Sequence, residues 1–157
     1  MRLRHPGVAA MVRKDRLTVE QRSENMRAIK AFGTKPEQVV ELWIRKLKIH
    51  HRKHDHNLPG RPDFVFPQSK RIILVHGDFW HGWRFSTWRN RLPKKYWRTK
   101  IERNRKNDLR NRRQLRRLGW QVLILWEHQI RRAPEPTFEK LRAFLYSDAS
   151  AGDASSR

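Results

Sequence analysis

The stretch KRIILVHG, residues 70–77, decides the fold class that we expect for this chain. A continuous apolar run bounded by charged residues and glycine is typical of a strand that is buried on both faces of a sheet. A second buried strand of this kind is expected in WQVLILWE, residues 120–127, directly after Gly119. A short strand is also expected at residues 63–66. These strands predict a sheet that is covered on both sides.

Segments with helical spacing can provide that cover. The segment GTKPEQVVELWIRKLKI, residues 33–49, predicts a helix. Thr34 can cap this helix, Pro36 fits its first turn, and Glu37 lies near the positive end of its dipole. Its apolar side chains form one stripe: Val40, Trp43, Ile44 and Leu47. Further helices are expected at residues 18–32, 95–118 and 137–146.

The order of these elements predicts the class and the domain organisation. Strands and covering helices interleave along the chain, which favours an α/β or α+β fold around one central mixed sheet. A chain of 157 residues fits one ordinary domain. We expect that domain over residues 18–147, a flexible basic arm over residues 1–17 and a disordered tail over residues 148–157.

The charge of the chain indicates a polyanionic partner. The formal net charge is +22, and the sequence pI is about 11.6. Nucleic acid is the first candidate, with a membrane surface or an acidic protein as alternatives. No apolar run approaches the roughly 20 residues that cross a bilayer, and the basic N-terminus does not resemble a signal peptide. We therefore expect a cytoplasmic protein associated with the nucleoid.

The chain contains no cysteine, which excludes disulfides and thiolate ligands for a metal. Any metal must bind to oxygen or to histidine nitrogen. The histidine-rich stretch HHRKHDH, residues 50–56, is a candidate metal site, but Arg52 and Lys53 would repel a cation. Alternate residues of a strand also point to opposite faces. We interpret this stretch as exposed or in contact with phosphate rather than as a metal site.

Polar groups at the ends of two strands are more informative. Asp63 begins one strand and can meet the backbone at the end of the next, at Val75 and His76, if the two strands are neighbours. A carboxylate and a carbonyl in this arrangement can hold Mg²⁺ beside a phosphodiester. Alternatively, Asp63 caps a turn after Pro62.

The stretch HGDFWHG, residues 76–82, adds two histidines and two aromatic side chains. One histidine of the pair His76 and His81 can contact a scissile phosphate, and the other can accept a proton from the attacking water. Either histidine alone would more often be structural. Phe79 and Trp80 can be buried under the following loop, or they can form a wedge that unstacks base pairs.

Four segments support a more specific interpretation when they are read together. They are RSENMRAIK at residues 22–30, LPGRPDFVF at 58–66, HGDFWHG at 76–82 and KIERNRKNDLRNRRQLRRLGWQVLILWE at 100–127. In order and spacing they resemble the very short patch repair (Vsr) DNA mismatch endonucleases, over roughly residues 18–130. The resemblance implies an α/β restriction-endonuclease-like single domain, with a central mixed β-sheet flanked by helices. It also implies Mg²⁺-dependent nicking of duplex DNA next to the T of a T:G mismatch, the lesion left by deamination of 5-methylcytosine.

The resemblance also implies roles for individual residues. Asp63 would be the principal Mg²⁺ ligand, and the backbone carbonyl of Val75 would be another. His76 would lie on the phosphate side, and His81 would be the general base. Glu37 would support the site through water or a histidine. The resemblance thus assigns the chemistry to two short stretches and to the start of one helix.

The same resemblance assigns the contacts with DNA. Phe79, Trp80 and Met26 would form the wedge that enters the duplex around the mismatch, and Asn104 and Asp108 match polar positions to which no role is assigned. A monomer bound to mismatched DNA is the expected complex. Two alternatives remain open, a restriction-type endonuclease that cuts matched DNA and a non-catalytic DNA-binding protein. The joint presence of four polar residues favours an enzyme, because binding alone would not require this set: Glu37, Asp63, His76 and His81.

The chain departs from the family pattern at a structural zinc. The resemblance implies that the four zinc ligands would fall at Asp78, Trp83, Phe85 and His128, and each of these ligands has changed type or been lost. We therefore expect no structural zinc. Because the four positions would be neighbours, we expect Asp78 and His128 to form a charge-assisted hydrogen bond, and Trp83 and Phe85 to fill the former metal volume. The alternative is that Asp78 lies at the surface and pairs with Arg84.

Overall fold

The structure is a computed structural model that describes Thr18, residues 33–92 and residues 95–147. The basic arm at residues 1–17, the disordered tail at 148–157 and nearly all of the helix expected at 18–32 therefore lie outside the described residues. Met26, which we expect in the wedge, also lies outside them.

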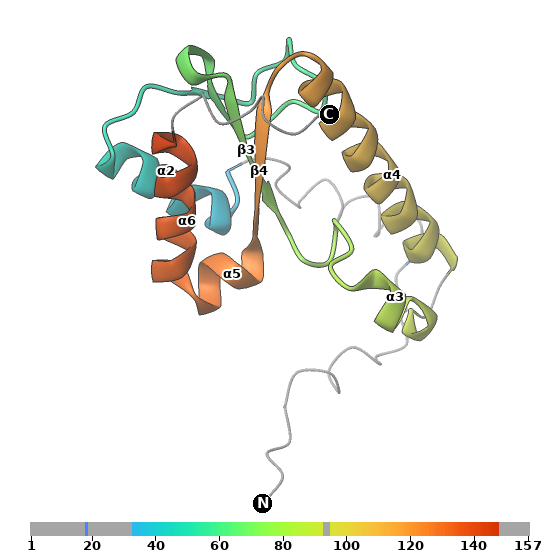
Figure 1. The fold of residues 1–157 in the computed structure, drawn as a ribbon. Helices are drawn as coiled ribbons and strands as arrows, with labels where there is room; N and C mark the ends of the chain where they lie inside the picture. Colours follow the sequence, from blue (N-terminus) through green and yellow to red (C-terminus); the bar gives the residue numbers. More distant parts are fainter. Residues whose placement is uncertain (1–17, 19–32, 93–94, 148–157) are drawn as a thin grey trace, which may run out of the picture.

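The described residues form an α/β fold (Figure 1). The helices are α2 (Lys35–Lys46), α3 (Phe85–Trp88), α4 (Lys95–Arg117), α5 (Glu127–Arg132) and α6 (Pro134–Tyr146). The strands are β1 (Arg52–Lys53), β2 (Phe64–Phe66), β3 (Arg71–His76) and β4 (Gln121–Trp126). Two short 3-10 turns, η2 (Pro67–Ser69) and η3 (Arg89–Arg91), complete these elements. The helix expected at residues 33–49, the strand at 70–77 and the basic helix at 95–118 are confirmed.

The four strands form one mixed sheet in the order β1-β2-β3-β4. Strand β2 is antiparallel to both of its neighbours, β1 and β3. Strands β3 and β4 are parallel, with Arg71 opposite Gln121 and His76 opposite Trp126. Two adjacent parallel strands need a long crossover, which α3 and α4 supply. A mixed sheet flanked by helices confirms the expected fold class, consistent with a restriction-endonuclease-like fold.

The helices cover the sheet on two sides. Helices α2, α5 and α6 lie on one side and α4 on the other (Figure 1). The larger core cluster joins the first side to the sheet: Val40, Ile44, Phe64, Phe66, Ile73, Val75, Leu125, Ile130, Leu141 and Leu145. On the second side, Leu115 of α4 packs against Val65 and Ile72. Strand β3 is therefore buried on both faces, as its sequence predicts.

Strand β4 differs from its expected burial. Its apolar run predicts a strand as buried as β3, but among its residues only Leu125 is fully buried. The reason is its position, because β4 is an edge of the sheet and has a neighbouring strand on one side only.

Among the described residues, no helix is long and apolar enough to cross a membrane.

Candidate active site

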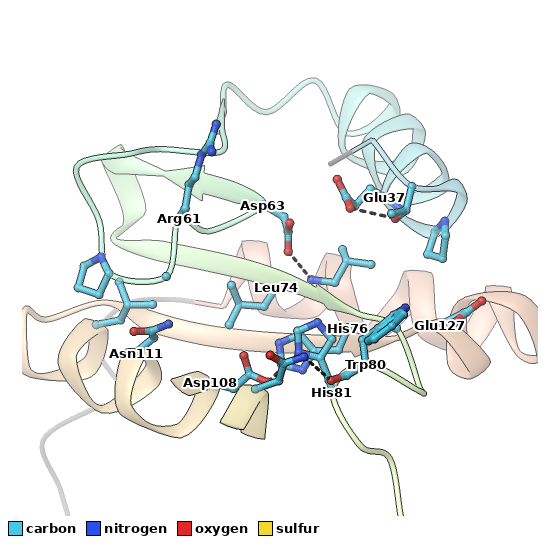
Figure 2. A pocket seen from close by; sticks show the side chains of 18 of the residues that line it. Glu37, Arg61, Asp63, Leu74, His76, Trp80, His81, Asp108, Asn111 and Glu127 are labelled. Carbon is cyan, nitrogen blue, oxygen red and sulfur yellow. Dashed lines mark hydrogen bonds and ion pairs between the residues drawn. The ribbon is translucent and has the colours of Figure 1, made fainter. Parts of the chain in front are cut away.

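A pocket of about 520 Å³ opens where β3 ends, between the first turn of α2 and the helix α4 (Figure 2). Four of the residues that the sequence predicts in the site line this pocket: Glu37, Asp63, His76 and His81. They come from a helix start, a strand start, a strand end and a loop, and only the fold brings them together. Val75 and Trp80 line the same pocket.

Asp63 lies directly before β2, beside the end of the antiparallel strand β3. Its Oδ2 accepts a hydrogen bond of 2.7 Å from the backbone N–H of Val75, so the expected proximity of these two residues is confirmed. Burial, reinforced by the nearby carboxylate of Glu37, raises the pKa of Asp63 to about 7, although the bond from Val75 opposes this shift. A cation beside Asp63 would remove the cost of its charge, so this carboxylate suits a metal ligand.

Glu37 is buried in the first turn of α2, where the cap of the helix fixes its side chain. Its Oε2 accepts a hydrogen bond of 2.8 Å from the backbone N–H of Gly33, and its Oε1 accepts one of 2.9 Å from the hydroxyl of Thr34. The N-terminal end of the helix dipole favours the negative charge at this position. Glu37 therefore presents a fixed carboxylate to the pocket.

His76 and His81 face each other as a stacked pair, with ring centroids 3.9 Å apart and planes 11° from parallel. His76, at the end of β3, is buried, and its burial together with the charge of His81 lowers the pKa of His76 to about 3. The imidazole of His76 is therefore neutral near pH 7. A neutral ring can donate one hydrogen bond and accept another.

Asp108 of α4 is a site residue to which the sequence assigned no role. Its Oδ2 lies 2.7 Å from Nδ1 of His81 (Figure 2). A carboxylate accepts hydrogen bonds, so Nδ1 carries a proton, and in the neutral ring Nε2 of His81 is the acceptor. The signal in the sequence is slight: Asp108 and Glu102 are the two acidic residues in a helix that is otherwise rich in Arg and Lys.

His54 is an exception within the histidine-rich stretch, which we interpreted as exposed or in contact with phosphate and in which His50, Arg52, Lys53 and His56 are exposed. The side chain of His54 is 17% exposed, and it lies between Glu37 and Asp63. The physical reason is that β1 is only two residues long and the backbone turns at His54, with φ of 50°, so the alternation of a regular strand does not apply. In the described part of the chain, two groups of side chains could hold a metal ion. They are Glu37, His54 and Asp63, and His76, His81 and Asp108.

Phe79 and Trp80 are half-buried in an aromatic cluster rather than fully buried or freely exposed. The ring of Phe79 stacks on Trp88 at 5.6 Å and meets Trp80 edge-on at 5.0 Å. Nζ of Lys100 lies 5.6 Å from the ring of Trp80, and the side-chain amide of Asn104 donates a hydrogen bond of 3.1 Å to its carbonyl. Helix α4 thus holds Trp80 at the rim of the pocket, with Phe79 packed against it.

Asp78 and His128 form the expected pair on the other side of the loop. Oδ1 of Asp78 lies 2.7 Å from Nδ1 of His128, so Asp78 pairs with this histidine rather than with Arg84. The ring of Trp83 packs against His128, with centroids 4.5 Å apart. Phe85 is buried as well, but its ring packs against Trp88. A carboxylate–imidazole hydrogen bond and a tryptophan ring therefore join this loop to α5.

Comparisons with known proteins agree with this architecture. The family described as DNA mismatch endonuclease Vsr matches residues 14–87. The type II nicking enzyme V.XorIIP of Xanthomonas oryzae pv. oryzae is 37% identical over 119 residues, which cover 74% of this chain and 86% of that enzyme. The type II nicking enzyme V.NmeDIP of Neisseria meningitidis serogroup C is 35% identical over 133 residues, 82% of this chain and 88% of the relative. The DNA mismatch endonuclease Vsr of Escherichia coli strain K12 is 36% identical over 121 residues, which cover 76% of this chain and 78% of that enzyme.

These matches include the pocket. Asp63, His76 and His81 all lie inside the range that the family model covers. The matched regions cover 86%, 88% and 78% of the length of the three relatives named above, so the similarity is not confined to one motif. The chain belongs to the Vsr family of DNA mismatch endonucleases and nicking enzymes, and it is an endonuclease whose substrate is DNA.

Proposed function

We propose that this endonuclease nicks duplex DNA next to the T of a T:G mismatch, with Mg²⁺ as cofactor, in the repair of deaminated 5-methylcytosine. One observation carries the proposal: the pair of His81 and Asp108, 2.7 Å apart, lines the same pocket as the carboxylate of Asp63. Phosphodiester hydrolysis needs a base for water and a site for a cation within reach of one phosphate.

In this proposal His81 is the general base. Asp108 holds Nδ1–H of His81, so Nε2 points its lone pair away from Asp108 and can accept a proton from water. Asp108 then stabilises the imidazolium that forms, as a positioning carboxylate does for a catalytic histidine. Its part is to fix the tautomer and the orientation of His81.

Asp63 and the backbone carbonyl of Val75 would hold the Mg²⁺, and Glu37 would act on it through water. Bound there, the ion would polarise the scissile phosphate and stabilise the leaving oxygen. The fit rests on Asp63, whose burial beside a second carboxylate makes its own charge costly without a cation. His76, which is neutral, would donate a hydrogen bond to a phosphate oxygen.

The aromatic residues at the rim of the pocket support a mismatch as the substrate. Phe79 and Trp80, with Met26, would enter the duplex as a wedge, because a mismatched pair costs less to unstack than a matched one. Lys100 beside Trp80 would neutralise a nearby phosphate. One copy would act as a monomer, since a single chain supplies every group of the pocket.

A nicking assay tests this function. A labelled duplex with one T:G pair is incubated with the protein and Mg²⁺, with EDTA, and beside matched T:A and C:G duplexes. We expect one nick on the T strand of the mismatched duplex, none with EDTA, and none with Asp63→Ala. Glu139→Ala, which removes an exposed carboxylate of α6, is the matched control and should nick normally.

Each alternative function has its own outcome in that assay. Equal cutting of matched and mismatched DNA would favour a restriction-type endonuclease. Tight binding of the T:G duplex without any nick in Mg²⁺ would favour a non-catalytic DNA-binding protein. Nicking by Asp63→Ala at the wild-type rate would overturn the site that we assign.

A further inference from the structure

Three side chains from separate parts of the fold converge beside the pocket. Glu37 comes from the first turn of α2, His54 from the turn after β1, and Asp63 from the residue before β2. Nε2 of His54 lies 3.8 Å from Oε2 of Glu37, and Nδ1 of His54 lies 4.0 Å from Oδ1 of Asp63. One ligand atom from each residue lies within 4.8 Å of the other two.

Both separations are too long for hydrogen bonds, which span about 2.7–3.2 Å from nitrogen to oxygen. The two separations involve different nitrogens of His54, and an imidazole binds one ion through one nitrogen only. The spacing that bears on a shared ion is therefore the 4.8 Å within which one ligand atom of each residue lies, against roughly 3–4 Å between two atoms that are each about 2.1 Å from an ion. An ion among the three groups would need only a small inward movement of the side chains.

The backbone holds the three groups in this arrangement. The backbone N–H of His54 donates a hydrogen bond of 3.2 Å to the carbonyl of Asp63, which ties the two residues together across the β1–β2 pair. Asp63 uses Oδ2 for the N–H of Val75, so Oδ1 is the oxygen that lies nearer His54. Each oxygen of Glu37 accepts one hydrogen bond and retains a lone pair.

The charges of the group favour a cation. Two carboxylates, of Glu37 and Asp63, lie 3.8 Å and 4.0 Å from the ring nitrogens of His54. In its neutral form this imidazole can ligate a metal. A divalent ion would compensate both negative charges and use the nitrogen lone pair.

We propose that Glu37, His54 and Asp63 form a mixed carboxylate and imidazole site for a divalent transition-metal ion such as Mn²⁺. An imidazole ligand favours transition metals over Mg²⁺, which prefers oxygen ligands and retains its water. The site deepens the proposed function, because it shares Asp63 with the Mg²⁺ site and would let the nuclease use either ion. Its metal binding can nevertheless be measured without DNA.

The alternative is that His54 is protonated and only forms ion pairs with the two carboxylates. In that case the group needs no metal, and His54 contributes no nitrogen to any bound ion. The two interpretations differ in a spectroscopic property that does not depend on nicking.

Electron paramagnetic resonance of Mn²⁺ added to the metal-free, full-length protein tests the proposal. We expect one bound Mn²⁺ whose pulsed spectrum shows coupling to a histidine nitrogen, and we expect His54→Gln to lose that coupling. His54→Gln should weaken Mn²⁺ binding by about 10-fold or more and Mg²⁺ binding by less than about 2-fold. His50→Gln, at an exposed position four residues earlier, is the matched control and should keep the coupling and the affinity.

Two results would overturn the site. They are a wild-type spectrum without nitrogen coupling, and a coupling that persists in folded His54→Gln or in the second variant His54→Asn. Circular dichroism of each variant establishes that it is folded. If Mn²⁺ binds through His54 but T:G duplexes are not nicked, the proposed function fails and the metal site stands.

Discussion

The titratable side chains on the two sides of the loop after β3 lie in different environments. Towards the pocket, burial works against ionisation, since it raises the pKa of Asp63 to about 7 and lowers that of His76 to about 3. Towards α5, Asp78 and His128 meet at 2.7 Å, and both side chains remain partly exposed. The pocket side thus holds buried groups whose ionisation is disfavoured beside the His81–Asp108 pair, whereas the side towards α5 holds a carboxylate and an imidazole that hydrogen-bond outside the pocket.

This difference separates function from stability. Perturbed titratable groups that gather in a pocket are typical of sites that bind or transform a ligand. Asp78 and His128 form their pair outside that pocket, and a pair in such a place chiefly fixes the chain. We therefore expect substitutions in the pocket to remove activity while leaving stability unchanged or raising it. Substitutions of the Asp78–His128 pair should lower stability and largely preserve activity.

The largest expected effect is on nicking by variants of the His81–Asp108 pair. His81→Gln should lower the single-turnover rate on a T:G duplex about 10³-fold, because it removes the general base. Asp108→Asn should lower that rate about 10²-fold, because the base remains but the carboxylate that orients it is lost. The double variant should be no slower than His81→Gln, since the two residues act as one unit. Asn107→Ala, next to Asp108 on α4, is the control. Independent, multiplying losses in the double variant would contradict a positioning role for Asp108.

The next effect is a gain in stability. Asp63→Asn should raise the free energy of unfolding at pH 8, with EDTA present, by up to about 4 kcal/mol, because about 3 pKa units separate the folded and unfolded carboxyl. In the wild type, the folded protein binds the proton of the Asp63 carboxyl more tightly than the unfolded chain does. The free energy of unfolding of the wild type therefore falls as the pH rises from about 4 to 7. The gain should shrink below about 2 kcal/mol at pH 5. Urea denaturation at both pH values measures it, and an equal gain at both would contradict the buried, repelled carboxylate.

The smallest expected effect concerns the Asp78–His128 pair. Asp78→Asn and His128→Gln should each lower the free energy of unfolding by about 1 kcal/mol, with a coupling of similar size in the double-mutant cycle. Nicking should fall by less than about tenfold, because neither group lies in the proposed machinery. The cycle should give the same coupling with and without EDTA. A coupling that disappears with EDTA would show that a metal, not a hydrogen bond, joins the two residues.

The fold was largely predictable because it depends on local patterns. The apolar run at residues 70–77 and the capped, striped segment at 33–49 each have enough residues to define their element and its buried face. The lower burial of β4 was not predictable, because its place at the sheet edge depends on which strands pair. The short helix α5, directly after β4, was not expected either.

The site was predictable only in part. Asp63, His76 and His81 occur in motifs, so the resemblance placed them, and the structure brings them into one pocket with Glu37. The contact of Asp108 with His81 depends on how α4 crosses the sheet, which no local pattern specifies. The place of His54 beside Glu37 and Asp63 was not predictable, because a positive φ at this one residue turns its side chain away from the alternation of a regular strand.

The central claim is that the carboxylate of Asp63 serves chemistry at the expense of stability. Single-turnover nicking of a T:G duplex by Asp63→Asn at pH 8 in Mg²⁺ tests it most directly, because the substitution keeps the shape of the side chain and an acceptor for the N–H of Val75. We expect a protein that is more stable than wild type and nicks at least about 10³-fold more slowly. An Asp63→Asn protein that nicks at the wild-type rate would contradict the claim.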